Sequence, residues 1–506
     1  MKYIKISIVI LLVSFISIFA YKLTTNNSNN KLSLTKEQMK EMLSYTIDGN
    51  STSSMPTKGS GYKVKSITCK SGSILSWDND NWLLEVEKLE SEDLCNIDFT
   101  TGIGSYTVTV VPSIAGSLDS TSKTTTENGT VTFYTNLAID SVSGCTNEIS
   151  DGKVIVKNVT SNTTCNINVS YTLYEKLLSD RGIATTNRTT FSAAFDSTDQ
   201  VLYTAKEDNK TVYYFAGNVT TNWVKFGKNA SNQDLYWRII RTNSDGGVRL
   251  LYHGTSTTAT DAYIGTSKFN ETYNNSMYVG YMYGTSGSQA SNRANTNNST
   301  IKTAIDNWYA SNMTSYTKYL STTAVYCNDR EVGSGTYSAT GSSFYYAAFT
   351  RLSTNKTPTY TCTNTDDKFT VDTSTGNGKL THPIALMTAD EISYAGGIYG
   401  NYNANAWYFR NAKEGALTTS SSSTDASYSS TGSQWWWLLS PSDWTGSSAG
   451  VFSVFGSSYP GYLNNDGVSG AGGVRPAVSL KSCVKTSGGD GSARTPYTIE
   501  ESTSGC

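Results

Sequence analysis

The stretch from Trp435 to Leu480 decides the fold and reads WWWLLSPSDWTGSSAGVFSVFGSSYPGYLNNDGVSGAGGVRPAVSL. It opens with Trp435–Pro441 and closes with Gly473–Leu480, two apolar runs that are typical of buried strands. Between them, Ser442–Gly472 is rich in Ser, Gly, Asn, Asp, Tyr and Trp and contains one apolar, strand-like insert, Val451–Phe455. Tyr and Trp provide a large contact area at low entropic cost, and Ser, Gly and Asn provide adaptable hydrogen bonds. The stretch therefore predicts a rigid frame that displays a binding surface.

The residues of this stretch divide into a frame and a ligand-binding face. Core substitutions typically cost about 2–5 kcal/mol and surface substitutions stay within about 0.5 kcal/mol, so a variable surface requires an apolar, buried frame. Alternation along the insert places Val451 and Phe455 on the same side as Ser453. We assign Trp435–Trp437 to the frame with Leu438, Leu439, Val451, Phe452, Val454, Val474, Ala477 and Val478. The predicted ligand-binding face consists of Ser442, Asp443, Trp444, Thr445, Ser453, Phe455, Ser457, Ser458, Tyr459, Tyr462, Asn464, Asn465, Asp466, Ser469 and Ala471.

The motifs of this stretch also resemble a known family. They are a WWLLSP opening at 436–441, an aromatic strand at 451–455 and a GVRPA closing at 473–477. Together they are similar to the end of a C-type-lectin-type α+β fold, in the branch shared by formylglycine-generating enzymes and by the variable proteins of diversity-generating retroelements. The second group is the closer match. The resemblance covers about residues 202–480, and its specific motifs lie in the last part.

The resemblance implies a binding function. In the variable proteins, adenine-directed mutagenesis rewrites the segment between the framing strands, and the varied side chains bind the ligand. It thus implies that residues 442–471 are a diversified face for a protein or glycan ligand on another cell, phage or host surface. The formylglycine-generating relatives use a cysteine pair in their catalytic cleft, whereas no cysteine lies between Cys362 and Cys483. We therefore expect no enzymatic activity, and the tripeptides of calcium-dependent animal lectins, Glu-Pro-Asn and Trp-Asn-Asp, are absent as well.

Length and composition indicate a multidomain, β-rich chain. With 506 residues it exceeds one ordinary core. Its 34 Tyr and 10 Trp, among many Ser, Thr, Asn and Gly, favour strands with polar loops. Only 16% of the residues are charged, the formal net charge is −2, and no long basic block occurs. Nucleic acid is therefore not expected as a partner, because phosphate binding needs clustered Lys and Arg.

The N-terminus predicts export. Lys2 and Lys5 precede an apolar run from Ile6 to Ala20, followed by a polar segment. The run is short for a bilayer span and typical of the core of a signal peptide. Residues 1–21 are thus predicted to be a signal peptide or an uncleaved membrane anchor, and the protein to be extracellular, either secreted or anchored to the cell membrane.

Eight cysteines and a sequence repeat organise the next part of the chain. In an exported chain without any CxxC motif they favour disulfides over metal ligation. Two segments repeat: Ser66–Cys69, Leu84–Val86 and Leu94–Phe99 recur as Ser141–Cys145, Val154–Val156 and Thr164–Val169, and each copy carries one cysteine pair. Each copy is expected to consist of alternating strands linked by its own disulfide, and the second, completed to a sandwich, resembles the small immunoglobulin-like repeats of bacterial surface proteins. We expect disulfides between Cys69 and Cys95, Cys145 and Cys165, Cys327 and Cys362, and Cys483 and Cys506.

The predicted domain boundaries follow from these signals. Residues 22–60 are expected to be a stalk with a helical patch at Leu34–Tyr45, 61–103 a small disulfide-linked β unit, and 104–171 an immunoglobulin-like sandwich that includes strands at Tyr106–Val111 and Gly129–Tyr134. Residues 172–200 are expected to be a linker, 201–485 the lectin-type domain and 486–506 a tail.

The lectin-type region contains a meander of strands and two helices. Short strands are predicted at Val212–Gly217, Trp223–Gly227, Tyr236–Arg241 and Val248–Tyr252, with a hairpin turn at 243–246. The i, i+3, i+4, i+7 spacing of apolar residues predicts an amphipathic helix over 300–310 that Ser299 caps. A capping-box pattern, Thr388 with Glu391, predicts a second helix over 388–395.

Little in the chain points to catalysis. The two histidines, His253 and His382, lie in no catalytic or metal-binding motif, so we expect both to be structural and expect no metal and no cofactor. The cluster Asp329-Arg330-Glu331 fits a local salt bridge, with ion or ligand binding as the alternative. The sequence thus predicts an adhesin- or receptor-like surface protein. Its alternatives are a structural or pilus-like surface component and, less in keeping with the cysteines, a formylglycine-generating type of enzyme.

Overall fold

The computed structural model describes residues 41–58, 60–78, 82–90, 92–100, 106–125, 129–150, 152–415, 422–503 and 506, and the backbone of 5–11 and 18–24. The chain divides into two compact units, Met1–Ser170 and Tyr171–Cys506. In both, strand residues outnumber helical residues, which confirms a β-rich protein with more than one domain. Of the predicted signal or anchor and stalk, residues 1–4, 12–17 and 25–40 lie outside the described residues. Within the described part, we find no helix with the length and apolar character needed to cross a membrane.

The N-terminal unit contains two modules with separate cores. In the first module, one sheet has the order β4-β3-β8-β5 and the other the order β2-β1-β7-β6. Its core includes Trp82, Leu84, Val86, Ile97 and Phe99. The strands are β1 (Lys5–Leu11), β2 (Ile18–Thr24), β3 (Leu43–Ile47), β4 (Asn50–Thr52), β5 (Lys63–Cys69), β6 (Ile74–Asp78), β7 (Leu83–Lys88) and β8 (Cys95–Thr100).

The second module repeats this plan. Its sheets have the orders β10-β9-β15-β12 and β11-β14-β13. Alternating apolar residues of β9, β11, β14 and β15 fill the core, among them Val108, Phe133 and Val154. The strands are β9 (Tyr106–Pro112), β10 (Ser122–Thr125), β11 (Gly129–Tyr134), β12 (Ala138–Ser143), β13 (Asn147–Ser150), β14 (Lys153–Val159) and β15 (Thr163–Ser170).

The two modules share their topology as well as their cysteines. In each, the last strand pairs in parallel with an earlier strand, β8 with β3 and β15 with β9. The predicted disulfides Cys69–Cys95 and Cys145–Cys165 are confirmed. The modules differ at one strand. In the second module β11 pairs with β14, whereas in the first module β1 takes the corresponding place beside β7. The described residues between β4 and β5 of the first module contain no strand.

The first module begins earlier than the repeat predicts. Strand β3 starts at Leu43, inside the expected stalk, and the expected helical patch is wrong for residues 43–45. Leu43, Tyr45 and Ile47 pack against the module's core while Ser44 and Thr46 alternate with them. An alternation with a period of two residues is typical of a strand. At these residues it determines the structure, rather than the helical spacing predicted for Leu34–Tyr45.

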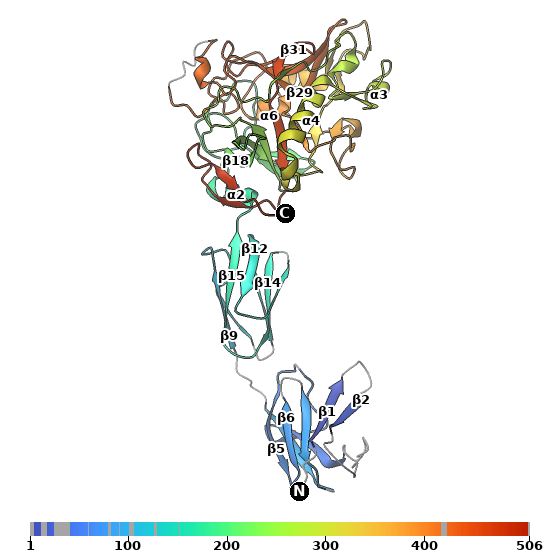
Figure 1. The fold of residues 1–506 in the computed structure, drawn as a ribbon, viewed down its shortest axis with the longest axis vertical. Coiled ribbons are helices and arrows are strands. Elements are labelled where there is room, and N and C mark those ends of the chain that lie inside the picture. Colours follow the sequence, from blue (N-terminus) through green and yellow to red (C-terminus); the bar gives the residue numbers. More distant parts are fainter. Residues whose placement is uncertain are drawn as a thin grey trace. The chain divides into compact units, whose positions relative to one another are not determined.

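Two large sheets build the C-terminal unit (Figure 1). The larger has the order β28-β33-β20-β19-β18-β35-β34, with β17 bonded to β19 and β16 to β17. The meander and the turn at 243–246 are confirmed, since Gly246 donates to the Asn243 carbonyl and takes a positive φ of 83°. The strands are β16 (Tyr203–Glu207), β17 (Lys210–Tyr214), β18 (Trp223–Lys228), β19 (Asp234–Thr242), β20 (Val248–Tyr252), β28 (Ile384–Leu386), β33 (Pro476–Leu480), β34 (Thr486–Gly488) and β35 (Tyr497–Ile499).

The smaller sheet carries the stretch that follows Trp435. Its order is β21-β32-β29-β26-β25, and β30 and β31 extend from β29. Its strands are β21 (Thr266–Ser267), β25 (Val332–Ser334), β26 (Phe344–Tyr346), β29 (Trp436–Trp444), β30 (Ala449–Val454), β31 (Leu463–Gly467) and β32 (Gly472–Gly473). Two-stranded pairs join β22 (Met282–Tyr283) to β23 (Asn297–Asn298) and β24 (Tyr326–Cys327) to β27 (Lys368–Phe369).

Both predicted helices are present. Helix α4 (Thr300–Asn312) is capped by Ser299, which accepts a bond from the Lys302 amide, and α6 (Ala389–Tyr394) has the Thr388–Glu391 capping box. The helices are short and lie among long irregular loops, as Figure 1 shows for the green-to-red part of the chain. The remaining helical segments are α3 (Gln289–Asn292), α5 (Ala347–Phe349), and the short turns Ser276–Val279, Thr314–Tyr319, Thr350–Asn355, Thr365–Asp367 and Ala426–Tyr428.

The expected linker and tail are parts of the C-terminal unit. Helix α2 (Leu173–Asp180) begins at a Thr172–Glu175 capping box, and Leu173 and Leu177 are buried in the unit's core. Strands β34 and β35 continue the larger sheet, with Tyr497 buried. The Thr172–Glu175 capping box and the i, i+4 spacing of Leu173 and Leu177 are local signals for a helix. The polar composition of residues 172–200 as a whole favoured a linker instead. The disulfides Cys327–Cys362 and Cys483–Cys506 complete the predicted set.

Candidate ligand-binding face

A three-stranded ribbon of β29, β30 and β31 carries the predicted binding segment. β29 pairs with β30, and β30 with β31, both antiparallel. The predicted frame is buried throughout: Trp436, Trp437, Leu438, Leu439, Val451, Phe452, Val454, Val474, Ala477 and Val478 are at most 1% exposed, and Trp435 packs against this core. Both sides of the start of β29 are therefore core, and the ligand-accessible surface begins only at its far end.

The pairing of β26 with β29 shows which side chains at the C-terminal end of β29 face the core and which face away from it. Phe344 lies opposite Trp444, and both are buried. Tyr345 lies opposite Asp443, and Tyr345 is 45% exposed. Because successive residues of a strand point to opposite faces, Tyr345 and Asp443 share the face turned away from the core.

Asp443 is the centre of a polar network on this outer face. Its Oδ1 accepts hydrogen bonds from Ser442 Oγ at 2.6 Å and from Asn465 Nδ2 at 2.8 Å. The hydroxyl of Tyr399 donates to Asn465 Oδ1 at 2.9 Å. Burial raises the pKa of Asp443, against the opposing effect of the bonds from Ser442 and Asn465. The network joins four side chains from three parts of the chain in one arrangement.

Aromatic rings surround the network. Tyr345 stacks on Phe349 with 4.3 Å between centroids, and Phe349 contacts Tyr399 edge-to-face at 5.1 Å. Phe452, beneath them, contacts both Phe349 and Tyr399. Such pairs gain stability beyond the area they bury, so these rings form a preorganised surface.

Three tyrosines and Phe455 continue this surface. Tyr402 stacks on Tyr459 at 5.9 Å, and Tyr462 and Phe455 complete the cluster with centroid distances of 5.7 to 6.1 Å. Tyr402 is 36% and Tyr459 45% exposed. A bridge between Tyr399 and Leu463 ties the loop that carries Tyr402 to the ribbon. We call Tyr345, Phe349, Tyr399, Tyr402, Asp443, Phe455, Tyr459, Tyr462 and Asn465 the tyrosine face.

Four residues of the predicted face are buried. Trp444 and Ser453 point to the core side of the ribbon, together with Val451, because of strand alternation. Ser442 is buried beside Asp443, and Ser457 is buried below the loop that carries Tyr459. These four are therefore not part of an accessible surface. Of the other predicted residues, Thr445, Ser458, Tyr459 and Ala471 are exposed, and Asp443, Phe455, Tyr462, Asn464, Asn465, Asp466 and Ser469 are partly exposed.

The structure also adds residues that lie outside the predicted segment. Tyr345, Phe349, Tyr399 and Tyr402 come from other loops and from β26. A signal for two of them was present, since residues 396–403 read GGIYGNYN and share the Gly, Tyr and Asn composition of residues 442–471. Tyr345 and Phe349 carry no comparable local signal.

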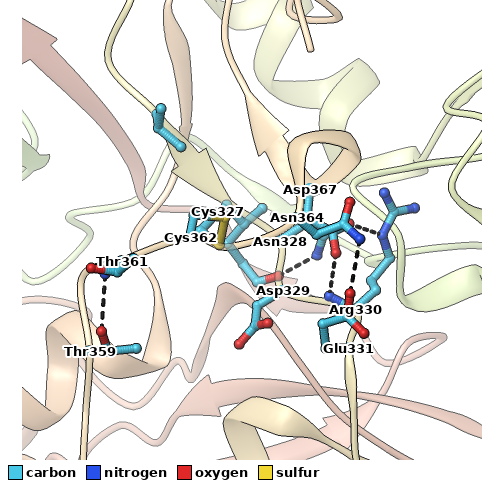
Figure 2. The surroundings of a disulfide bond; sticks show 12 residues. Cys327, Asn328, Asp329, Arg330, Glu331, Thr359, Thr361, Cys362, Asn364 and Asp367 are labelled. Carbon is cyan, nitrogen blue, oxygen red and sulfur yellow. Dashed lines mark hydrogen bonds and ion pairs between the residues drawn. A yellow bond between two sulfur atoms is a disulfide. The ribbon is translucent and has the colours of Figure 1, made fainter. Parts of the chain in front are cut away.

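Figure 2 shows that the cluster Asp329-Arg330-Glu331 lies beside the Cys327–Cys362 disulfide. Each of its three residues makes an ion pair. Asp329 pairs with Arg351 at 2.7 Å, Arg330 with Asp367 at 2.6 Å and Glu331 with Arg293 at 3.1 Å. Burial raises the pKa of Asp329 in spite of Arg351. The pairs join β24, β27 and the neighbouring loops, which favours the salt-bridge interpretation of this cluster.

A second charged cluster is buried deeper, where Glu391 at the start of α6 accepts from two arginines. Its Oε1 lies 2.9 Å from Arg241 Nε and 2.9 Å from Arg249 Nη1. Arg241 also binds Glu207 at 2.8 Å. Burial alone would raise the pKa of Glu391, but Arg249 and Arg241 outweigh it and hold that pKa below its ordinary value. The cavity beside this cluster measures about 20 Å³, room for a single water and not for an organic substrate.

Both histidines pack against aromatic rings. His253 is fully buried and meets Trp223 edge-to-face at 4.4 Å, and His382 stacks on Tyr309 at 4.5 Å. In the described part of the chain, one group of three potential metal ligands lies close together, Cys69, Asp93 and Cys95. Its two cysteines form a disulfide with each other and offer no thiolate to a metal.

His253 should make stability depend on pH. Burial, joined by the charges of Arg475 and Arg238, lowers its pKa well below the ordinary value. The pKa of a histidine in an unfolded chain is about 6.5. Below that pH the unfolded chain binds more protons than the folded chain, so the free energy of unfolding falls by at most about 1.4 kcal/mol per pH unit. Thermal unfolding from neutral pH to about pH 5.5 should show a shallower decline for His253→Phe than for the natural chain. Equal slopes would contradict this assignment.

Comparisons with known proteins reach the C-terminal unit only. Residues 260–482 match a protein family described as "Domain of unknown function (DUF6273)". The matched range includes α4, α6 and the whole tyrosine face, but less than half of the chain. No curated protein and no solved structure matches the chain.

Proposed function

We propose that this chain is an extracellular ligand-binding protein of the adhesin or receptor type, and that the tyrosine face binds its ligand. The supporting observation is a group of exposed, mutually stacked tyrosines on a ribbon whose other side is core. Tyrosine is enriched where binding energy concentrates, and rigid rings lose little entropy on binding. The four disulfides fit an oxidising, extracellular location.

The proposal extends to the folds. The two N-terminal modules are proposed to be immunoglobulin-like, on the support of two sheets each, a largely shared topology and one disulfide each. The C-terminal unit is proposed to be a C-type-lectin-type domain similar to the variable proteins of retroelements. The buried frame and the accessible residues among 442–471 support this, because such a surface accepts varied side chains. The proposed ligand is a protein or glycan on another surface, and anchoring through the N-terminus is part of the same proposal.

A triple substitution tests the face. Replacing Tyr402, Tyr459 and Tyr462 with alanine should weaken binding to an immobilised array of glycans and extracellular proteins by at least about tenfold, since residues of this kind commonly contribute more than about 1 kcal/mol each. The melting temperature should change little. The control is Tyr134→Ala in the second module, which removes an exposed tyrosine away from the face. Retained binding by the triple variant would exclude the tyrosine face as the site.

Diversification has a genomic test. The DNA near the gene should contain a reverse transcriptase and a near-copy of the segment encoding 435–480 that differs at adenines. Identical segments across a population, without such a template, would leave a binding face of fixed specificity.

A further inference from the structure

An open groove of about 510 Å³ runs along the N-terminal half of α4. Its walls are the loop 267–272, the β22–β23 pair and the exposed side of the helix, represented by Thr303 and Asn307. The volume falls within the range of about 300–1,000 Å³ that is typical of small-molecule sites. No residue of the tyrosine face lines it, so the groove is a separate feature of the C-terminal unit.

The lining is polar and nearly neutral. Asparagines and hydroxyl side chains supply most of it, and Tyr283 supplies the aromatic ring. Glu271 is the one carboxylate in the lining, and Lys268 pairs with it at 2.6 Å. No arginine or lysine lines the groove, and Ala304 is its one aliphatic residue. Phosphate and sulfate groups would therefore find no cation there, and a lipid chain would find no apolar wall.

Hydrogen-bonding groups in the groove are left available. Asn270 is almost fully buried in the lining, and its side-chain Nδ2 is enclosed and has no partner among the described residues. The side chains of Asn298 and Asn307 are exposed to the same space. Amides both donate and accept, as the hydroxyl groups of a sugar do.

The walls of the groove are held rigidly. Trp437 Nε1 donates to the Ser267 carbonyl at 2.9 Å, and the Asn270 amide donates to the Val468 carbonyl at 3.0 Å. On the opposite wall, Ser299 Oγ donates to the Tyr281 carbonyl at 2.8 Å and caps α4. The side chains that line the groove are thus preorganised on fixed backbone, which lowers the entropic cost of binding.

We infer that this groove is a binding site for a neutral saccharide, with asparagine amides and hydroxyls bonding the sugar hydroxyls and the Tyr283 ring supporting its apolar side. It is a second site, and it does not require that the tyrosine face binds a ligand. The chemistry of the lining favours uncharged hexoses and N-acetylhexosamines over acidic sugars, because the one ionised group in the groove is a carboxylate.

Ligand-observed NMR on the full chain tests the inference. The probes are glucose, galactose, mannose, N-acetylglucosamine and N-acetylgalactosamine, with N-acetylneuraminic acid as the charged comparison. At least one neutral probe should show saturation transfer from the protein, and the charged probe should show none. The absence of saturation transfer to every neutral probe, or saturation transfer to the charged probe alone, would overturn the inference.

Variants then locate the signal. Thr303→Arg and Asn307→Arg place a long side chain in the groove from exposed helical positions where arginine is well tolerated, and each should weaken binding at least about tenfold with an unchanged melting temperature. The control variant Tyr134→Ala, which removes an exposed tyrosine of the second module, should bind the sugar normally. Tyr402→Ala/Tyr459→Ala is the comparison variant: loss of sugar binding in it, with full binding by both groove variants, would assign the sugar to the tyrosine face and reject the groove. Failure of the groove test leaves the triple tyrosine experiment as an independent result.

Discussion

Replacing Glu391 with alanine is expected to lower the free energy of unfolding of the C-terminal unit by about 3–5 kcal/mol. Glu391 is 2% exposed, and one of its oxygens serves both Arg241 and Arg249. Its other oxygen accepts from the Thr388 amide and completes the cap of α6. Alanine would leave two buried guanidinium groups short of negative charge and would remove one of the two hydrogen bonds of the capping box.

The matched control is Glu331→Ala. Glu331 also pairs with an arginine, Arg293, but its side chain is 40% exposed. Arg293 is buried but keeps a second carboxylate partner, Asp367 at 3.4 Å, when Glu331 is removed. The loss of stability in Glu331→Ala, measured by denaturant titration, should therefore be smaller than that in Glu391→Ala. Similar losses in the free energy of unfolding for both variants would show that the burial of the Glu391 cluster does not increase its contribution to stability.

Trp437→Ala is expected to cost about 3–5 kcal/mol of the same unit's stability. The ring is fully buried, packs edge-to-face on Phe269 at 5.7 Å and bonds the Ser267 carbonyl. Alanine creates a cavity beneath the ribbon and leaves that carbonyl unpaired. The comparison variant Tyr459→Ala removes an exposed ring and should change stability by no more than about 0.5 kcal/mol.

These two variants also separate frame from face by function. Trp437→Ala should lower the melting temperature first and binding as a consequence, whereas Tyr459→Ala should lower binding alone. A large loss of stability in Tyr459→Ala, measured by calorimetry, would place that ring in the core and contradict the tyrosine face.

Local signals predicted much of the architecture. The cap at Ser299 and the capping box at Thr388 specify α4 and α6 because both involve neighbours within one helical turn. The repeat predicted the disulfides Cys69–Cys95 and Cys145–Cys165, since each copy carries its own pair. Helix α2 was missed although Thr172 and Glu175 carry the same kind of signal, because the surrounding composition is that of a linker.

The candidate site was predictable only in part. Composition locates the segment but does not say which side of a strand faces solvent, so Trp444 and Ser453 were misplaced. The side of a strand that faces solvent depends on the strands with which it pairs. Here Asp443 pairs with Tyr345, which lies almost one hundred positions away in the sequence. Likewise Tyr399 reaches Asn465 through tertiary contacts alone. A single sequence gives no physical basis for predicting such distant pairs.

The parallel pairing of β9 with β15 has a mechanical consequence. The chain enters the second module on β9 and leaves it on β15, and the two strands are adjacent, in register from Val108 with Thr163 to Pro112 with Ile167. A pull along the chain therefore makes these strands slide past each other. The ladder bonds are then loaded in shear and together, rather than opened one after another as when a hairpin is unzipped. While the Cys145–Cys165 bond is intact, the residues between these cysteines add nothing to the length of a stretched chain.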